Sequence, residues 1–102
     1  MEGYAGNILK IDLDNEKIYT EPLSEKLVKD YIGGRGFASR ILFDSLKPGI
    51  DPFSPDNMIV VASGPLAGTL TPGAGKVTFA VKSPATGSYG DSNMGGHFIG
   101  IL

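Results

Sequence analysis

Residues 62–96 read ASGPLAGTLTPGAGKVTFAVKSPATGSYGDSNMGG, and they are the most informative part of this sequence. Eight of its residues are glycine, and Pro65, Pro72 and Pro84 each mark a turn. The apolar run at residues 77–81 is typical of a strand. Glycine at this density in an ordered region indicates a backbone with positive φ or a close approach to another group. Two explanations stay open: tight turns between strands, or main-chain N–H groups that line an anion site.

The overall composition indicates one globular domain with few positive charges near its glycine-rich part. The 102 residues are 41% apolar and 20% charged, and the net charge is −2. The nine Lys and Arg residues form no cluster, which argues against a nucleic-acid surface. Seven of them lie at or before Lys47, so only Lys76 and Lys82 can offer charge to an anion bound in the glycine-rich stretch.

The chain has no cysteine and a single histidine. The missing cysteines exclude a thiolate zinc site and a cysteine-ligated iron–sulfur cluster within this chain. No run approaches the roughly 18 apolar residues that would predict a membrane span. The first residues, MEGYAGN, have neither the basic nor the apolar part of a signal peptide. We therefore expect a cytoplasmic protein that does not associate with a membrane or with nucleic acid.

Periodicity predicts an α+β fold, with a mainly antiparallel sheet and two helices packed on one face. Ser24 fits the N-cap of the first helix, and the glycines around Arg35 separate it from the second. The continuous apolar run at 58–62 indicates a strand buried on both faces. The expected elements are strands at 7–13 and 17–21, helices at 24–32 and 37–46, and strands at 58–62, 77–82 and 87–91.

Known phosphate-binding patterns fail in the glycine-rich stretch. A P-loop would need glycine at Leu70 and Ser or Thr at Val77, and the dinucleotide fingerprint would need a small residue at Thr78. What remains is a turn at 71–76 that delivers Lys76 to the start of a strand. A second turn at 93–96 can face its main-chain groups toward a ligand, or can be a plain loop. Arg35 has two interpretations as well: it can serve a ligand, or stabilise a helix C-terminus.

Taken together in their order and spacing, the motifs resemble the N-terminal end of the tungsten- or molybdenum-dependent aldehyde:ferredoxin oxidoreductases. The resemblance covers essentially the whole chain. The motifs are the Gly6-Asn7 hairpin start, Gly34-Arg35-Gly36, Asp51-Pro52-x-Ser54-Pro55, Gly64-Pro65-Leu66-x-Gly68-Thr69, Lys82-Ser83-Pro84-x-Thr86-Gly87 and Asn93-x-Gly95-Gly96.

The resemblance implies a role for the chain as a whole. In that family the N-terminal domain is a base for a metal held by two pterin dithiolenes, built from two α+β halves around an approximate two-fold axis. Residues 1–102 would be its first half, truncated at the C-terminal end. The parent enzyme would oxidise an aldehyde to a carboxylate and pass electrons through a [4Fe–4S] cluster, ligated outside this chain, to ferredoxin. Tungsten and molybdenum both stay open.

The resemblance also implies site residues. Asn93 and Gly95 match the family's segment that meets the pterin phosphates and their bridging magnesium, with the main chain of Asn93 at the metal. Lys76 stands where familiar members have arginine, so the charge is kept without the bidentate fork. No catalytic residue and no cluster ligand is expected in this chain, which we expect to be inactive alone.

The sequence also leads to expectations about binding partners, and it leaves other classes of function open. The rest of the parent polypeptide would cover apolar surface and open strand edges, and without it two copies of the chain would pair as a homodimer. The alternative function is a non-catalytic binding or assembly module that shares the fold. A small binder of phosphate ligands, unrelated to the family, is the third interpretation.

Overall fold

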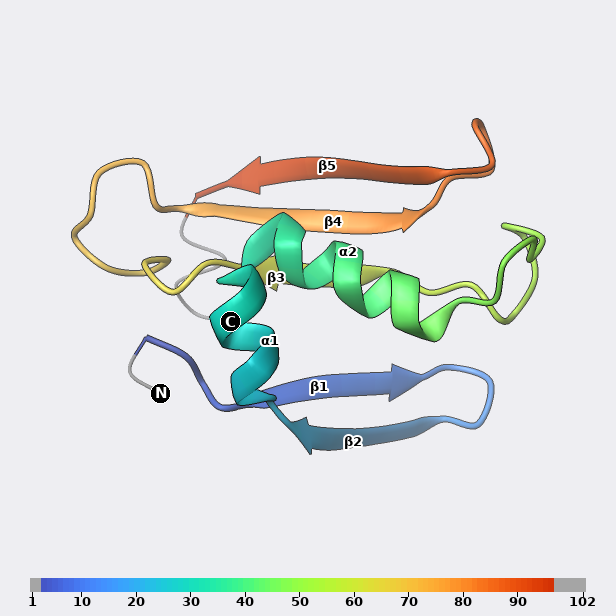
Figure 1. The fold of residues 1–102 in the computed structure, drawn as a ribbon, viewed down its shortest axis with the longest axis horizontal. Coiled ribbons are helices and arrows are strands. Elements are labelled where there is room, and N and C mark those ends of the chain that lie inside the picture. Colours follow the sequence, from blue (N-terminus) through green and yellow to red (C-terminus); the bar gives the residue numbers. More distant parts are fainter. Residues whose placement is uncertain (1–2, 97–102) are drawn as a thin grey trace.

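The computed structural model describes residues 3–96, and it shows an α+β fold with two antiparallel sheets (Figure 1). One sheet is the hairpin of β1 with β2, and the other has the order β3-β4-β5 with β4 in the centre. The elements are β1 (Asn7–Asp12), β2 (Lys17–Pro22), α1 (Glu25–Tyr31), α2 (Gly34–Ser45), β3 (Val60–Ser63), β4 (Lys76–Lys82) and β5 (Tyr89–Gly95). The expected fold class and element order are confirmed.

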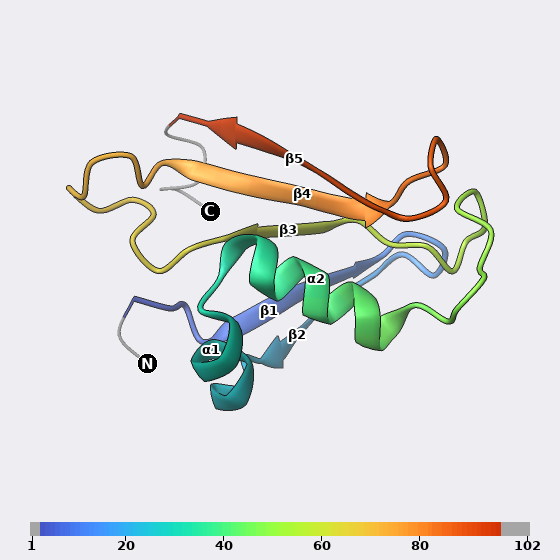
Figure 2. The same cartoon turned by 45° about the horizontal axis from the view of Figure 1, so that its top comes forward.

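The hairpin forms because its turn is closed by side-chain hydrogen bonds. Ile11 lies opposite Ile18 in the ladder. At the turn, the Asp12 carboxylate accepts hydrogen bonds from the side-chain amide of Asn15 at 2.9 Å and from the main-chain N–H groups of Asp14 and Asn15. These bonds hold the pKa of Asp12 below its usual value, the Asn15 side chain contributing most. Figures 1 and 2 both place the hairpin on the β3 side of the molecule, away from β5.

The two helices meet at a tight corner. The Ser24 hydroxyl caps α1 by accepting from the Leu27 N–H at 3.4 Å, as expected. The second helix begins at Gly34, three residues earlier than its apolar period indicated, so the glycines around Arg35 lie in its first turn. A Cβ atom at position 36 would lie 2.6 Å from the main-chain oxygen of Tyr31. Only glycine lets the first turn of α2 approach the end of α1 this closely.

The core lies between α2 and the three-stranded sheet. Ala38 and Leu42 of α2 pack with Ala80 of β4, and all three are buried. Half-buried apolar side chains surround this group: Leu46, Val60 and Ala62. The helix α1 packs against α2 rather than on the sheet itself. None of the helices in residues 3–96 is long and apolar enough to cross a membrane.

One expectation about β3 is wrong. Its residues were expected to be buried on both faces, yet the strand begins at Val60, and Ile59 and Val61 are 71% and 42% exposed. Their side chains lie on the face of the sheet opposite to α2, because Val61 pairs with Phe79 whereas Val60 pairs with the buried Ala80. That second face is open only in part, because Val77 of β4 lies on it and is 1% exposed.

The last strand is also longer than expected. The segment from Asn93 was expected to be a tight turn, but Asn93 and Gly95 belong to β5, which pairs with β4 over seven residues. The turn lies earlier, where the Ser83 N–H donates to the Ser88 carbonyl at 2.7 Å. Once that turn sets the register, cross-strand pairing outweighs the turn preference of Asn and Gly on this edge strand.

Candidate functional site

The three site residues expected from the sequence lie together on β4 and β5. Lys76 is the first residue of β4 and faces Gly95, and Asn93 faces Thr78 two positions further along the same ladder. Residues two apart point to the same face of a strand, so this group lies on the face that carries α2. Lys76, Asn93 and Gly95 are all exposed, and Lys76 makes no ion pair with another residue of the range 3–96.

The Asn93 side chain is oriented by Thr78. The Thr78 hydroxyl, in a residue only 8% exposed, donates to Oδ1 of Asn93 at 2.9 Å. The carboxamide oxygen is thereby engaged, and the Asn93 NH₂ group keeps its donors for another acceptor. Thr78 was not expected as a site residue, because its role depends on the register between two strands, which only the turn after Lys82 determines.

The turn also fixes the direction of the main-chain groups of β5. In an antiparallel ladder, pairs that exchange hydrogen bonds alternate with pairs whose N–H and C=O groups point outward. The Ser83 N–H donates to the Ser88 carbonyl, which places these two residues at a position of the first kind, although the Ser83 carbonyl itself accepts from Gly87 in the turn. The next pair, Lys82 with Tyr89, is therefore of the second kind, and so is every second pair along the ladder.

It follows that Asn93 and Gly95 direct their main-chain groups away from β4, since both belong to pairs of the outward kind. In the described part of the chain β5 has no neighbour on that side. We call the outward main-chain groups of Asp91, Asn93 and Gly95 the β5 edge. It offers carbonyl oxygens, which suit a hard cation, and N–H groups, which suit an anion. No group of three or more acidic or histidine side chains that could hold a metal occurs in residues 3–96.

A second cluster of polar side chains connects β5 to α2. The Arg35 Nε forms an ion pair with Oδ2 of Asp91 at 2.7 Å, and the Tyr89 hydroxyl donates a hydrogen bond to the same oxygen at 2.8 Å. The Asp91 side chain is 17% exposed, although its main chain lies at an open edge. Burial raises the pKa of the Tyr89 hydroxyl, and the hydrogen bond to Asp91 raises it as well. Arg35 lies in the first turn of α2, so the interpretation that it stabilises a helix C-terminus is wrong.

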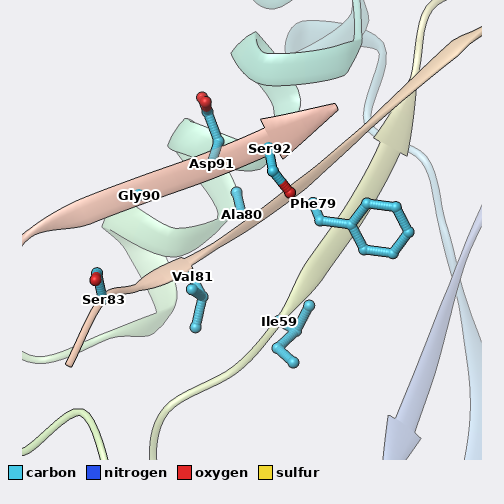
Figure 3. A pocket seen from close by; sticks show the side chains of 8 residues that line it. All are labelled: Ile59, Phe79, Ala80, Val81, Ser83, Gly90, Asp91 and Ser92. Carbon is cyan, nitrogen blue, oxygen red and sulfur yellow. The ribbon is translucent and has the colours of Figure 1, made fainter. Parts of the chain in front are cut away.

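The opposite face of the sheet offers no comparable chemistry. It carries a shallow hollow of about 450 Å³ beside Ile59, Phe79 and Val81. Figure 3 shows Phe79 and Ile59 projecting to one side of the sheet and Asp91 to the other. The hollow is lined mainly by apolar groups, so it fits a packing surface better than a site for a charged ligand.

The comparisons with known proteins agree with this architecture. Residues 8–101 match the family described as "Aldehyde ferredoxin oxidoreductase, N-terminal domain". This chain belongs to that family. The tungsten-containing aldehyde ferredoxin oxidoreductase of Pyrococcus horikoshii is 42% identical over 98 residues, which are 96% of this chain and 16% of that protein. The WOR-like subunit of an aliphatic sulfonate oxidoreductase from Pyrococcus furiosus is 37% identical over 87 residues, 82% of this chain and 14% of that protein.

A solved structure shares the domain as well. The active site complex BamBC of benzoyl coenzyme A reductase, in complex with 1,5-dienoyl-CoA, matches with a TM-score of 0.90 and 30% sequence identity. The match covers 97% of this chain and 15% of that one. This aldehyde ferredoxin oxidoreductase N-terminal domain thus spans about one sixth of the length of the relatives that it matches.

Proposed function

We propose that this domain is part of the cofactor base of a tungsten- or molybdenum-pterin oxidoreductase, and that Lys76 and the β5 edge hold the phosphate–magnesium end of the cofactor. The observation that carries the proposal is the placement of Lys76 beside Asn93 and Gly95, on paired strands with outward main-chain groups. A cation supplies charge to phosphate, and Mg²⁺ takes oxygen ligands, among which main-chain carbonyls can complement phosphate oxygens and water. The donor set therefore fits both halves of a phosphate–magnesium group.

The range of relatives supports a role in binding the cofactor rather than the substrate. By their names, the relatives act on aldehydes, on aliphatic sulfonates and on a benzoyl thioester. These substrates share no recognition chemistry, while the N-terminal domain is common to the three proteins. A domain that accompanies different substrates serves what the reactions share, which is the redox cofactor.

The proposed parent reaction is the oxidation of an aldehyde with water to a carboxylate, which releases three protons and two electrons. A [4Fe–4S] cluster held by the rest of the polypeptide would pass the electrons to ferredoxin. The metal–pterin group supplies this redox chemistry when bound. The residues of the domain bind and orient it. The Lys76 Nζ would neutralise phosphate charge, the Asn93 NH₂ group would donate to a phosphate oxygen, and the Asn93 main-chain carbonyl would be available to the magnesium. The rest of the polypeptide supplies the cluster ligands, because this chain has no cysteine, and the proposed compartment is the cytoplasm.

The first test uses the 102-residue chain alone. We expect no aldehyde oxidation with a viologen as electron acceptor, because the chain has no cluster ligand and only part of the cofactor base. The measurement is turnover by chain purified to homogeneity, with a complete aldehyde ferredoxin oxidoreductase as the positive control. Turnover by the pure chain would contradict the division of labour proposed here. A reading frame after Leu102 without a C-x-x-C-type cluster would instead favour the binding or assembly module.

The isolated chain is also expected to pair with itself. The face opposite α2 exposes Ile59, Val61 and Met94, and β3 and β5 each have one unpaired edge within residues 3–96. Exposed apolar surface and open edges both promote association, and a symmetric dimer is the simplest closed form. Sedimentation velocity at rising concentration should show a dimer, and Val61→Lys, which puts a charge on that face, should weaken it. A clean monomer at high concentration would exclude the pairing.

A further inference from the structure

The ion pair between Arg35 and Asp91 differs from the other ion pairs of the described chain. Three ion pairs occur in residues 3–96. The pair of Lys10 with Glu21 lies within the hairpin, and the pair of Arg40 with Asp44 lies within α2. Of the three, the pair of Arg35 with Asp91 joins a helix to a strand. Its carboxylate side chain is the least exposed of the three, at 17%, whereas its cation is 64% exposed.

The position of this pair in the ladder connects it to the proposed cofactor site. Asp91 faces Ala80, and two residues further along β5 Asn93 faces Thr78. Asp91 and Asn93 therefore share one face of the strand and the same outward direction of their main-chain groups. Figure 3 shows the Asp91 carboxylate on the side away from Phe79, where α2 covers the sheet. Holding Asp91 in place also holds the direction of the carbonyl groups that follow it.

The strand needs such a support because it lies at an edge. In the described chain β5 hydrogen-bonds to β4 alone, and the helix α2 packs on β3 and β4. The residues of β5 that face the helix side include no large aliphatic side chain: Tyr89, Asp91, Asn93 and Gly95. Apolar packing therefore fixes β5 to α2 only weakly. The link is made instead by Oδ2 of Asp91, which pairs with the Arg35 guanidinium and accepts a hydrogen bond from Tyr89.

We propose that Arg35 and Asp91 are positioning residues, whose ion pair anchors β5 to the first turn of α2 and so orients the β5 edge toward the cofactor phosphate and its magnesium. The inference rests on the proposed function of this edge. It gives Arg35 an indirect role, acting through Asp91 and not through its own contact with the phosphate. The two roles make opposite predictions for Asp91. If Arg35 bound phosphate directly, removal of the Asp91 charge would free its guanidinium and preserve or improve retention of the cofactor.

The experiment compares charge-removing variants of the complete enzyme with a matched control pair. Arg35→Met and Asp91→Asn each remove one charge of the anchoring pair, and Arg40→Met and Asp44→Asn do the same to the ion pair inside α2. The first readout is hydrogen exchange of the β5 amides of Ser92 and Met94, which point toward β4 and report opening of the strand. The second readout is the tungsten or molybdenum and pterin content of each purified variant.

In both Arg35→Met and Asp91→Asn, we expect exchange at Ser92 and Met94 to be faster by about twofold to fivefold, the range for an ion pair whose cation is largely exposed. The cofactor content should fall in both, and the double variant should be no worse than either single one. The control pair should change neither readout. Arg35→Lys, which keeps a charge facing Asp91, should restore most of the loss.

Each other outcome overturns the inference. Unchanged exchange in both variants means that the pair does not anchor β5. Faster exchange with full cofactor content means that the anchor does not serve the cofactor. Lower cofactor content in Arg35→Met, with full content in Asp91→Asn, assigns Arg35 to direct phosphate contact. The proposed function itself fails on a different observation, full cofactor content in a variant without the Lys76 charge, so the two failures are distinguishable.

Discussion

Replacement of Lys76 by alanine in the complete enzyme should lower retention of the cofactor by about one to two decades. A charge-assisted contact contributes roughly 1.5–3 kcal/mol, and each 1.4 kcal/mol corresponds to about tenfold in affinity. Lys76 is exposed, lies opposite Gly95, and has no ion-pair partner in residues 3–96, so its loss disturbs little else. The measurement is metal and pterin content per protein after purification, with folding verified by circular dichroism.

Two further lysine variants sharpen this test. Lys76→Arg should retain the cofactor, because arginine keeps the charge and adds a bidentate fork for phosphate. Lys82→Gln is the control: its ammonium donates to the Ile50 carbonyl at 2.6 Å and so ties the loop before β3 to the end of β4. This variant should lose some stability and keep its cofactor. Full cofactor in Lys76→Ala together with loss in Lys82→Gln would reverse the roles assigned to the two lysines.

The sequence predicted most of the fold because its strongest signals are local. The N-cap at Ser24, the apolar face of α2 and the hairpin formed by the strands at 7–13 and 17–21 each depend on residues close to one another in the sequence. Burial of the β3 segment depends instead on which other parts of the protein cover the sheet. A run of apolar residues does not contain this information. Ile59 and Val61 are exposed for this reason, although their composition is that of a core strand.

For the candidate site, too, the residues with local signals were predicted correctly and those that depend on non-local pairing were not. Lys76 was placed correctly at a strand start, since a turn followed by an apolar alternation is a local pattern. Asn93 and Gly95 were expected in a turn, because their residue types favour one and the pairing with β4 is non-local. Thr78 and Asp91 gave no signal of their own. Both become visible only after the register is known, which places one opposite Asn93 and brings the other to Arg35.

The corner between the two helices should be the most sensitive place in the described fold to a single added methyl group. We expect Gly36→Ala to lower the free energy of unfolding by about 1–3 kcal/mol, the usual cost of overpacking. Alanine is preferred over glycine within a helix by roughly 0.5–1 kcal/mol, so propensity alone would give the opposite sign. The clash outweighs it because the obstacle is main chain: the new Cβ would lie 2.6 Å from the Tyr31 oxygen.

That oxygen cannot move aside without a further loss, since it also accepts the Gly33 N–H that leads the chain into α2. The matched control is Gly64→Ala, where an added Cβ meets nothing within 4 Å and the unfolding free energy should change by less than about 0.5 kcal/mol. Urea unfolding of both variants beside the parent protein measures the difference. Equal stability of the two variants would mean that the corner relaxes freely, and then the first turn of α2, with Arg35 in it, is not held in a fixed position relative to α1.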